Sequence, residues 1–189
     1  MNIFSKQNGH LAGISNISIE NFIFGKDETL KPKVTSILGN SYFVNVYYLK
    51  IETPKLSLEE DSINVYIPYQ YKNKNNQELL NAILLKMYTK IAQKEIELAM
   101  EKARHILGIA PEDFSIVPMA SLANCDKDKK SMMFNPYIVM YTRDVIEYIV
   151  FHEFCHLFYK NHSKKFYDLL RKYIPNYDEI ERKLASQNY

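Results

Sequence analysis

The sequence predicts an α+β fold in which a small antiparallel or mixed sheet packs against a long helix and a second, buried helix. Three observations support this prediction. Residues 1–70 are mostly β-like, because short alternating segments are separated by turn residues. From Asn76 to Leu107, apolar residues recur at the helical period. The segment from Asp144 to Phe158 is apolar around almost its whole circumference, which is typical of a buried helix.

The composition is that of an ordinary globular protein. The chain has 189 residues and a mass of 22.3 kDa, with 47% hydrophobic and 24% charged residues. This length favours one domain over residues 1–189, divided into a mostly β part at 1–70 and a main core at 76–189. The net charge of +2 and the pI of about 8.3 give no electrostatic footprint for nucleic acid or an anionic membrane.

Several features predict a cytoplasmic protein that does not enter a membrane. The first residues, Met1 to Gln7, lack the charged start and apolar run of a secretory signal. No apolar stretch reaches the roughly 18 residues of a membrane span. The two cysteines, Cys125 and Cys155, give no disulfide framework.

The first third of the chain contains three expected strands. Ser15–Phe24 partly alternates and ends at a turn, Tyr42–Ile51 is rich in β-branched and aromatic residues, and Ile63–Ile67 alternates cleanly before Pro68. Leu56–Asp61 is expected to be a polar connection. This part is therefore predicted to be a sheet.

The long helix is expected to begin with Asn75 or Asn76 as its cap and to end at Gly108. Its apolar residues from Leu79 to Leu107 predict one buried face. His105 lies near the carboxyl end, where an imidazole suits the helix dipole. A helix-end role for His105 is preferred over a metal role.

A hairpin is expected between the two helices. Its strands are Phe114–Ala123 and Met132–Asn135, with the polar turn Asp126–Lys130 between them. Asp126 and Asp128 suggest a calcium loop, but the glycine and the final glutamate of that pattern are absent. A solvated turn is the better interpretation.

The buried helix is expected to start at Thr142 or Asp144, since Asp144 and Glu147 have the spacing of a capping box. It contains His152-Glu153-Phe154-Cys155-His156, which places two imidazoles one turn apart on one face. Zinc with three protein ligands and one open position lowers the pKa of a bound water to about 7, and a nearby carboxylate then accepts the proton. Glu153 is predicted to be that general base.

The third ligand is expected to be His162, six residues after His156. A single helical face does not bring them together, so the helix must end between them. Asn161 tolerates the left-handed conformation that ends helices, and Ser163 is expected to cap a new helix that stops at Ile174-Pro175. The bend would return His162 to the ion and complete an open zinc site.

Four runs of residues in this half of the chain form a pattern that is typical of one protein family. They are Ser131 to Asn135, Val150 to Leu157, Asn161 to Phe166 and Ile174 to Tyr177. These runs resemble the YgjP-like zinc metallopeptidases, relatives of the SprT and WLM groups. The resemblance implies a zincin-like fold, a metallopeptidase core at 76–189, and zinc bound by His152, His156 and His162 with Glu153 as general base.

The predicted reaction is hydrolysis of a peptide bond in a peptide or protein substrate. Zinc and Glu153 would activate water, and Glu153 would pass the proton to the leaving amine. Tyr159 is a candidate to stabilise the oxyanion if the helix continues, although a packing role is preferred for it.

Two other functions remain open. One is a metal-dependent ribonuclease, because a family of RNA-processing hydrolases also uses three histidines at this spacing, although without the glutamate. A basic face beside the site would suit RNA; it would consist of Lys160, Lys164, Lys165, Arg171 and Lys172. Glu153 favours peptide hydrolysis over that alternative. The other is a non-catalytic module in which zinc only holds helices together, although a structural zinc site normally has four protein ligands.

Overall fold

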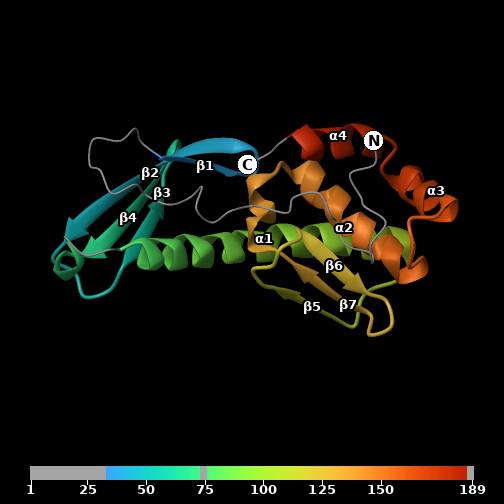
Figure 1. Cartoon of the computed structure of the whole chain (residues 1–189), viewed down its shortest axis with the longest axis horizontal. Coiled ribbons are helices and arrows are strands. Elements are labelled where there is room, and N and C mark those ends of the chain that lie inside the picture. Colours follow the sequence, from blue (N-terminus) through green and yellow to red (C-terminus); the bar gives the residue numbers. More distant parts are fainter. Residues whose placement is uncertain (1–32, 73–75, 187–189) are drawn as a thin grey trace.

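The computed structural model describes residues 33–72 and 76–186, and it has the predicted α+β fold (Figure 1). The strands form two mixed sheets at opposite ends of a long helix, and three further helices follow the second sheet. The strand expected at Ser15–Phe24 lies outside the described residues.

The N-terminal sheet has four strands in the order β1-β2-β4-β3. The pairing of β2 with β4 is parallel, and the other two pairings are antiparallel. The strands expected at Tyr42–Ile51 and Ile63–Ile67 are confirmed. The bounds are β1 (Lys33–Ile37), β2 (Asn40–Leu49), β3 (Lys55–Leu58) and β4 (Ser62–Pro68), followed by the short 3-10 helix η2 (Tyr69–Tyr71).

Strands β1 and β3 were not expected from the sequence. The prediction of a polar connection over Leu56–Asp61 is wrong for Leu56–Leu58, which belong to β3, and Ser57 pairs with Asn64 of β4. The two end residues of β3 are exposed and the two middle ones are partly buried, so its sequence carries no clear alternation, and the neighbouring strand stabilises it. Pairing partners, rather than local pattern, therefore decide this edge of the sheet.

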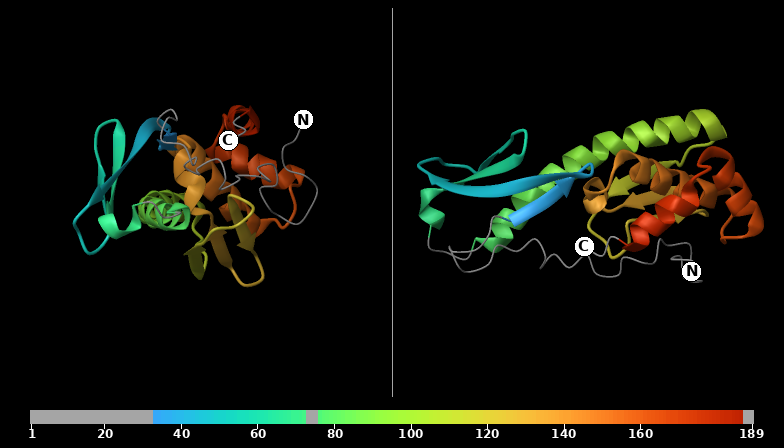
Figure 2. Two further views of the ribbon diagram at one scale, coloured as in Figure 1. Left: turned by 60° about the vertical axis from the view of Figure 1, so that its left-hand side comes forward. Right: turned by 90° about the horizontal axis from the view of Figure 1, so that it is seen from above.

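Helix α1 (Gln77–Leu107) is the element that connects the two sheets. Its 31 residues span about 46 Å, and Figure 2 shows it running from the N-terminal sheet along the rest of the molecule. Gly108 ends it in the left-handed conformation (φ 66°), as expected. In the described part of the chain no helix is both long and apolar enough to span a membrane.

The second sheet has the order β5-β7-β6, with bounds β5 (Asp113–Ile116), β6 (Ala123–Asp126) and β7 (Ser131–Phe134). The expected strand Phe114–Ala123 is in fact two elements. The hairpin joins β6 to β7, whereas β5 pairs with β7 in parallel. Asp126 Oδ1 accepts from the amides of Asp128 and Lys129, so it organises the turn, as the solvated-turn interpretation requires.

A 3-10 helix and three α-helices complete the chain. They are η3 (Pro136–Met140), α2 (Arg143–Phe158), α3 (Lys164–Tyr173) and α4 (Tyr177–Ser186). Thr142 is the cap residue of α2, which confirms one of the two expected starts, whereas the capping box predicted at Asp144 is wrong. Glu147 instead pairs with Lys102 of α1 at 2.5 Å. Helix α4 was not expected, although the spacing of its buried Tyr177, Ile180 and Leu184 is helical.

The turn between β1 and β2 is pressed against the start of α2. Leu38 (φ 52°) and Gly39 (φ 82°) form a two-residue turn in which both φ angles are positive. Leu38 donates its amide to the carbonyl of Val139 at 2.6 Å. A Cβ atom on Gly39 would lie 2.4 Å from Cγ2 of Thr142. The N-terminal sheet thus contacts Thr142, the residue that precedes α2.

Replacement of Gly39 by alanine is expected to destabilise the protein by about 2–4 kcal/mol, because the strained φ and the clash with a β-branched side chain act together. Denaturant unfolding measures this change. Gly108→Ala is the matched control: Gly108 also has a positive φ, but nothing lies within 4 Å of the added Cβ. We expect about 1–2 kcal/mol there. Equal losses would show that the contact with Thr142 contributes nothing.

Candidate metal centre

Three histidines from two segments meet at one point. His152 and His156 lie one turn apart on α2, and His162 lies in the connection to α3. Their Nε2 atoms form a triangle with sides of 2.9, 3.1 and 3.2 Å. His152 and His156 are buried and His162 is half-buried. Among the residues that the structure describes, this is the group of side chains suited to holding a metal ion.

The triangle has the size expected of ligands on one small cation. A tetrahedral zinc ion with Zn–N bonds of about 2.0–2.1 Å separates its nitrogen ligands by about 3.3 Å. Burial lowers the pKa of His152, and it lowers the pKa of His162 to about 4. Both rings are therefore neutral at pH 7, which is the state that binds a metal. The residues present thus fit a metal with three imidazole ligands.

A backbone carbonyl orients His156. Nδ1 of His156 lies 3.0 Å from the carbonyl oxygen of Tyr159. Because a carbonyl only accepts, Nδ1 must carry the proton, and Nε2 keeps the lone pair that a metal needs. Tyr159 therefore acts through its backbone. The side chain of Tyr159 was expected to lie over the histidines only if the helix continued through it. Helix α2 instead ends at Phe158. Oxyanion stabilisation by Tyr159 stays a prediction.

The bend that returns His162 differs from the one expected. Outside glycine, only Leu38 and Lys130 have positive φ in the described ranges, so the left-handed conformation predicted for Asn161 is wrong. The Asn161 carbonyl instead accepts the amide of Ser163 at 2.7 Å in a three-residue turn. Ser163 then caps α3 as predicted, since its Oγ accepts the amide of Phe166 at 3.4 Å.

Three aromatic side chains that the sequence did not place at the site contact the histidines: Phe166, Tyr148 and Tyr167, the last at 6.0 Å from the His162 ring. The ring of Phe166 lies 4.7 to 4.9 Å, centroid to centroid, from all three imidazoles. Tyr148, one turn before His152, contacts it edge to face at 5.9 Å. The contact between Tyr148 and His152 could have been predicted, because side chains four residues apart on a helix are neighbours. The histidines are thus held by packing on more than one side.

Glu153 lies beside the histidines in a fully buried position. Its relative exposure is 0%, and neither carboxylate oxygen has a hydrogen-bond partner among the described side chains and backbone. Burial raises its pKa well above the usual value of a glutamate. A buried carboxylate without a partner is costly, so this position is explained by a ligand that a metal would bring, such as water. The donor set and the unpaired carboxylate together fit a metal centre with a base.

The cysteines are free thiols, as expected. Burial and then the nearby Glu153 carboxylate raise the pKa of Cys125 to about 12, and the same two causes raise that of Cys155 to about 12. Both thiols are therefore neutral at pH 7. Neither belongs to the group of ligand atoms formed by the histidines. The described residues thus offer three candidate ligands at this point, the number that open zinc sites have, whereas structural zinc sites normally have four.

A cavity of about 450 Å³ opens beside His156. Residues Asn124 to Asp128 of β6 and its turn form one side, and His156, Lys160 and Asn161 form the other. The Lys127 ammonium group donates to the carbonyl of Phe158 at 2.6 Å, which fastens the turn to the end of α2. The metal centre is therefore reached from between β6 and the end of α2.

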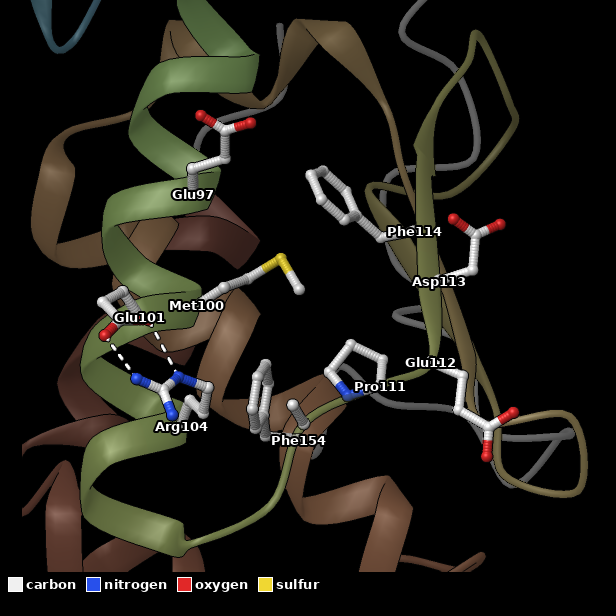
Figure 3. A pocket seen from close by; sticks show the side chains of 10 residues that line it. Glu97, Met100, Glu101, Arg104, Pro111, Glu112, Asp113, Phe114 and Phe154 are labelled. Carbon is white, nitrogen blue, oxygen red and sulfur yellow. Dashed lines mark hydrogen bonds and ion pairs between the residues drawn. The ribbon is translucent and has the colours of Figure 1, made fainter.

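A second cavity, of about 600 Å³, lies between α1 and β5 (Figure 3). Met100, Pro111, Phe114 and Phe154 form its apolar floor, and carboxylates stand around it. It contains none of the three histidines. His105, which was left outside the predicted site, is exposed and likewise does not join them.

The sequence profile of the family described as YgjP-like, metallopeptidase domain, matches residues 20–187 of the chain. The chain belongs to this family. The resemblance found in the sequence is thereby confirmed, and a YgjP-like chain is a metallopeptidase, which implies a metal cofactor and a peptide or protein substrate. No curated protein matches the chain. Among solved structures it is similar to the metallopeptidase zymogen jannalysin of Methanocaldococcus jannaschii, with 29% identity over 50% of this chain and 97% of that chain and a TM-score of 0.45.

Glu181 of α4 is a buried acid close to the centre of this metallopeptidase domain. It is 9% exposed, and burial raises its pKa to about 7. Because the folded protein holds this proton more tightly than the unfolded chain does, Glu181 stabilises the fold below about pH 4.5 and loses this contribution as the pH rises through about 7.

We therefore expect Glu181→Gln to raise the free energy of unfolding at pH 8 by about 1–2 kcal/mol, with little change at pH 4.5. Urea unfolding of both proteins in the presence of a chelator, at each pH, measures the difference. A gain of the same size at both pH values would contradict the assigned pKa.

Proposed function

We propose that this YgjP-like protein is a zinc-dependent peptidase in which His152, His156 and His162 hold the ion and Glu153 is the general base. The observation that carries the proposal is the triangle of Nε2 atoms, 2.9–3.2 Å apart, beside a buried and unpaired carboxylate. Zinc suits three imidazoles with an open fourth position. The HEXXH spacing on α2 supplies two of these ligands and the base together.

The residues of the chain perform the proton transfers. When bound, zinc supplies a Lewis acid that lowers the pKa of a water molecule to about 7 and polarises a carbonyl group. Glu153 accepts the proton from the attacking water on a carboxylate oxygen and then gives it to the leaving amine. The complete burial of Glu153 supports this role, since burial raises the pKa of its carboxylate and makes it a stronger base toward the attacking water.

The cavity between β6 and the end of α2 supports a substrate site. This cavity has a volume of about 450 Å³ and is lined in part by His156. It is large enough for a few residues of a peptide but too small for a folded domain. Lysine and aspartate side chains both border it, so its charge favours neither basic nor acidic substrates. We propose that the substrate chain enters here in an extended conformation.

A cytoplasmic location is part of the proposal. Two free cysteines and the absence of a membrane-spanning helix from the described residues are compatible with it. The proposed partner is a peptide or protein. Membership of a metallopeptidase family favours this substrate over RNA, and a three-ligand centre favours catalysis over a purely structural role.

Metal analysis combined with a cleavage screen tests the proposed function. Purified protein is expected to contain close to one zinc ion per chain and to cleave members of a peptide library. Removal of the metal by a chelator is expected to abolish cleavage, and added zinc to restore it. A protein that binds no zinc, or whose cleavage survives complete metal removal, would disprove the proposal.

A further inference from the structure

We propose that Glu181 of α4 and Tyr148 of α2 are a positioning pair that fixes the ring of His152 for metal binding. This inference rests on the proposed function, because it assumes that His152 is a metal ligand. If it is correct, α4, which contains no residue of the histidine motif, helps to position a metal ligand.

The contacts form a short chain from α4 to the metal centre. The Tyr148 hydroxyl donates to Oε1 of Glu181 at 3.0 Å. The ring of Tyr148 lies 5.9 Å from that of His152, with an angle of 61° between the planes. Tyr148 is 0% exposed and His152 is 0% exposed, so neither ring has room to move into solvent. Tyr148 thus contacts Glu181 through its hydroxyl and His152 through its ring.

The arrangement limits the orientation of the imidazole from two sides. Phe166 of α3 contacts the His152 ring edge to face at 4.9 Å, and Tyr148 contacts it in the same manner at 5.9 Å. An edge-to-face pair is favourable over a narrow range of orientations. Metal binding requires Nε2 to point at the ion, and outer-shell residues that orient a ligand ring through hydrogen bonds typically change metal affinity by about 10–100-fold. We expect an effect in this range from the Tyr148–Glu181 pair.

The cost of burying Glu181 indicates that its carboxylate has a specific role. A carboxylate with 9% exposure loses hydration, and an apolar side chain at this position would pack at a lower cost. Glu181 has no ion pair with any residue in the described ranges. What its side chain gains at this buried position is the hydrogen bond from Tyr148. The pair is thus not explained by general stabilisation of α4.

Contacts with α3 hold helix α4 in place, and they therefore fix the position of Glu181. At the first residue of α4, the Tyr177 ring stacks on that of Tyr167 at 5.7 Å, and the Arg171 guanidinium donates to the Tyr177 hydroxyl at 2.7 Å. Both partners belong to α3. The helix that carries Glu181 is therefore fixed to the helix that carries Phe166.

Zinc affinity of the full-length protein, measured by competition with a chromophoric chelator, tests the pair. Tyr148→Phe removes one oxygen atom and keeps the ring, whereas Glu181→Met removes the acceptor at similar volume. Both variants are expected to bind zinc about 10–100-fold more weakly than wild type. Glu181→Gln keeps an oxygen acceptor and is expected to stay within about threefold of wild type.

Tyr88→Phe is the matched control, because it also removes a buried hydroxyl, one that lies 2.8 Å from Oγ1 of Thr35 at the N-terminal sheet. It is expected to lower stability to a similar extent without changing zinc affinity. Cobalt substitution adds a second readout. The visible spectrum of the cobalt-loaded Tyr148→Phe protein is expected to shift, because the His152 ring has moved, whereas that of Tyr88→Phe is expected to match wild type.

Three results would overturn the pair. Zinc affinities of Tyr148→Phe and Glu181→Met equal to that of Tyr88→Phe would show that Tyr148 and Glu181 only stabilise the fold. A failure of Glu181→Gln to rescue the loss seen in Glu181→Met would exclude the hydrogen bond as the cause. A wild-type protein that binds no zinc would overturn both the pair and the proposed function. If wild type binds zinc and cleaves peptides, and Tyr148→Phe and Glu181→Met keep wild-type zinc affinity, only the pair is overturned.

Discussion

Replacement of Glu153 by glutamine is expected to lower kcat by about 10²–10⁴-fold while the zinc content stays at the wild-type level. Glutamine has nearly the same shape as glutamate, so the buried position remains filled and the three imidazoles keep their places. It cannot accept a proton, however, and the attacking water then loses its base. Steady-state kinetics on a peptide substrate and metal analysis of the same preparation measure the two effects.

Glu147→Gln provides the control for this change. Glu147 lies on the same helix, α2, but its side chain is 30% exposed and pairs with Lys102 of α1. The same substitution there is expected to leave kcat and zinc content unchanged. Activity of Glu153→Gln within a few-fold of wild type would remove Glu153 from the role of general base, and the proton acceptor would have to be sought elsewhere.

Replacement of His162 by alanine is expected to remove most of the bound zinc. The ion would keep two protein ligands, and a two-ligand site binds zinc much more weakly than a three-ligand site; we expect a loss of affinity of at least about 10²-fold. Activity is expected to fall in the same proportion at limiting zinc. Competition titration with a chelator gives the affinity, and far-UV circular dichroism reports on the fold.

His105→Ala separates this effect from the general loss of a histidine. His105 is exposed near the carboxyl end of α1 and does not contact the centre. Its replacement is expected to leave zinc affinity unchanged. If His162→Ala retained wild-type affinity, the third ligand would come from another part of the chain, and the turn at Asn161 would have no role in metal binding.

The sequence allowed the histidines that meet at the site to be predicted better than the way in which the chain brings them together. His152, Glu153 and His156 follow from a spacing that has meaning only on a helix, and α2 provides that helix. His162 required a bend, whose existence followed from the six-residue gap. The type of bend did not follow, because a three-residue turn at Asn161 depends on how Ser163 caps α3 rather than on any preference of Asn161 itself.

Elements that depend on distant partners were the ones that sequence patterns missed. Strand β3 exists because β4 offers it an edge, and its four residues carry no clear alternation. The contacts of Tyr148 with Glu181 and of Phe166 with the histidines join residues from different helices. Periodicity shows that such side chains are buried, but it does not show which of them meet.

Helix α1 links the part of the described chain that contains the three histidines to the N-terminal sheet, whose four described strands contain none of them. One of its buried residues, Tyr88, meets Thr35 of the N-terminal sheet, and farther along Glu95 accepts two hydrogen bonds from Arg143 at the start of α2, at 2.8 and 3.0 Å. Loss of the N-terminal sheet would expose the apolar face of α1 to water. We therefore expect damage to that sheet to destabilise α1 and the helix α2 that contacts it, and with them the arrangement of the three histidines.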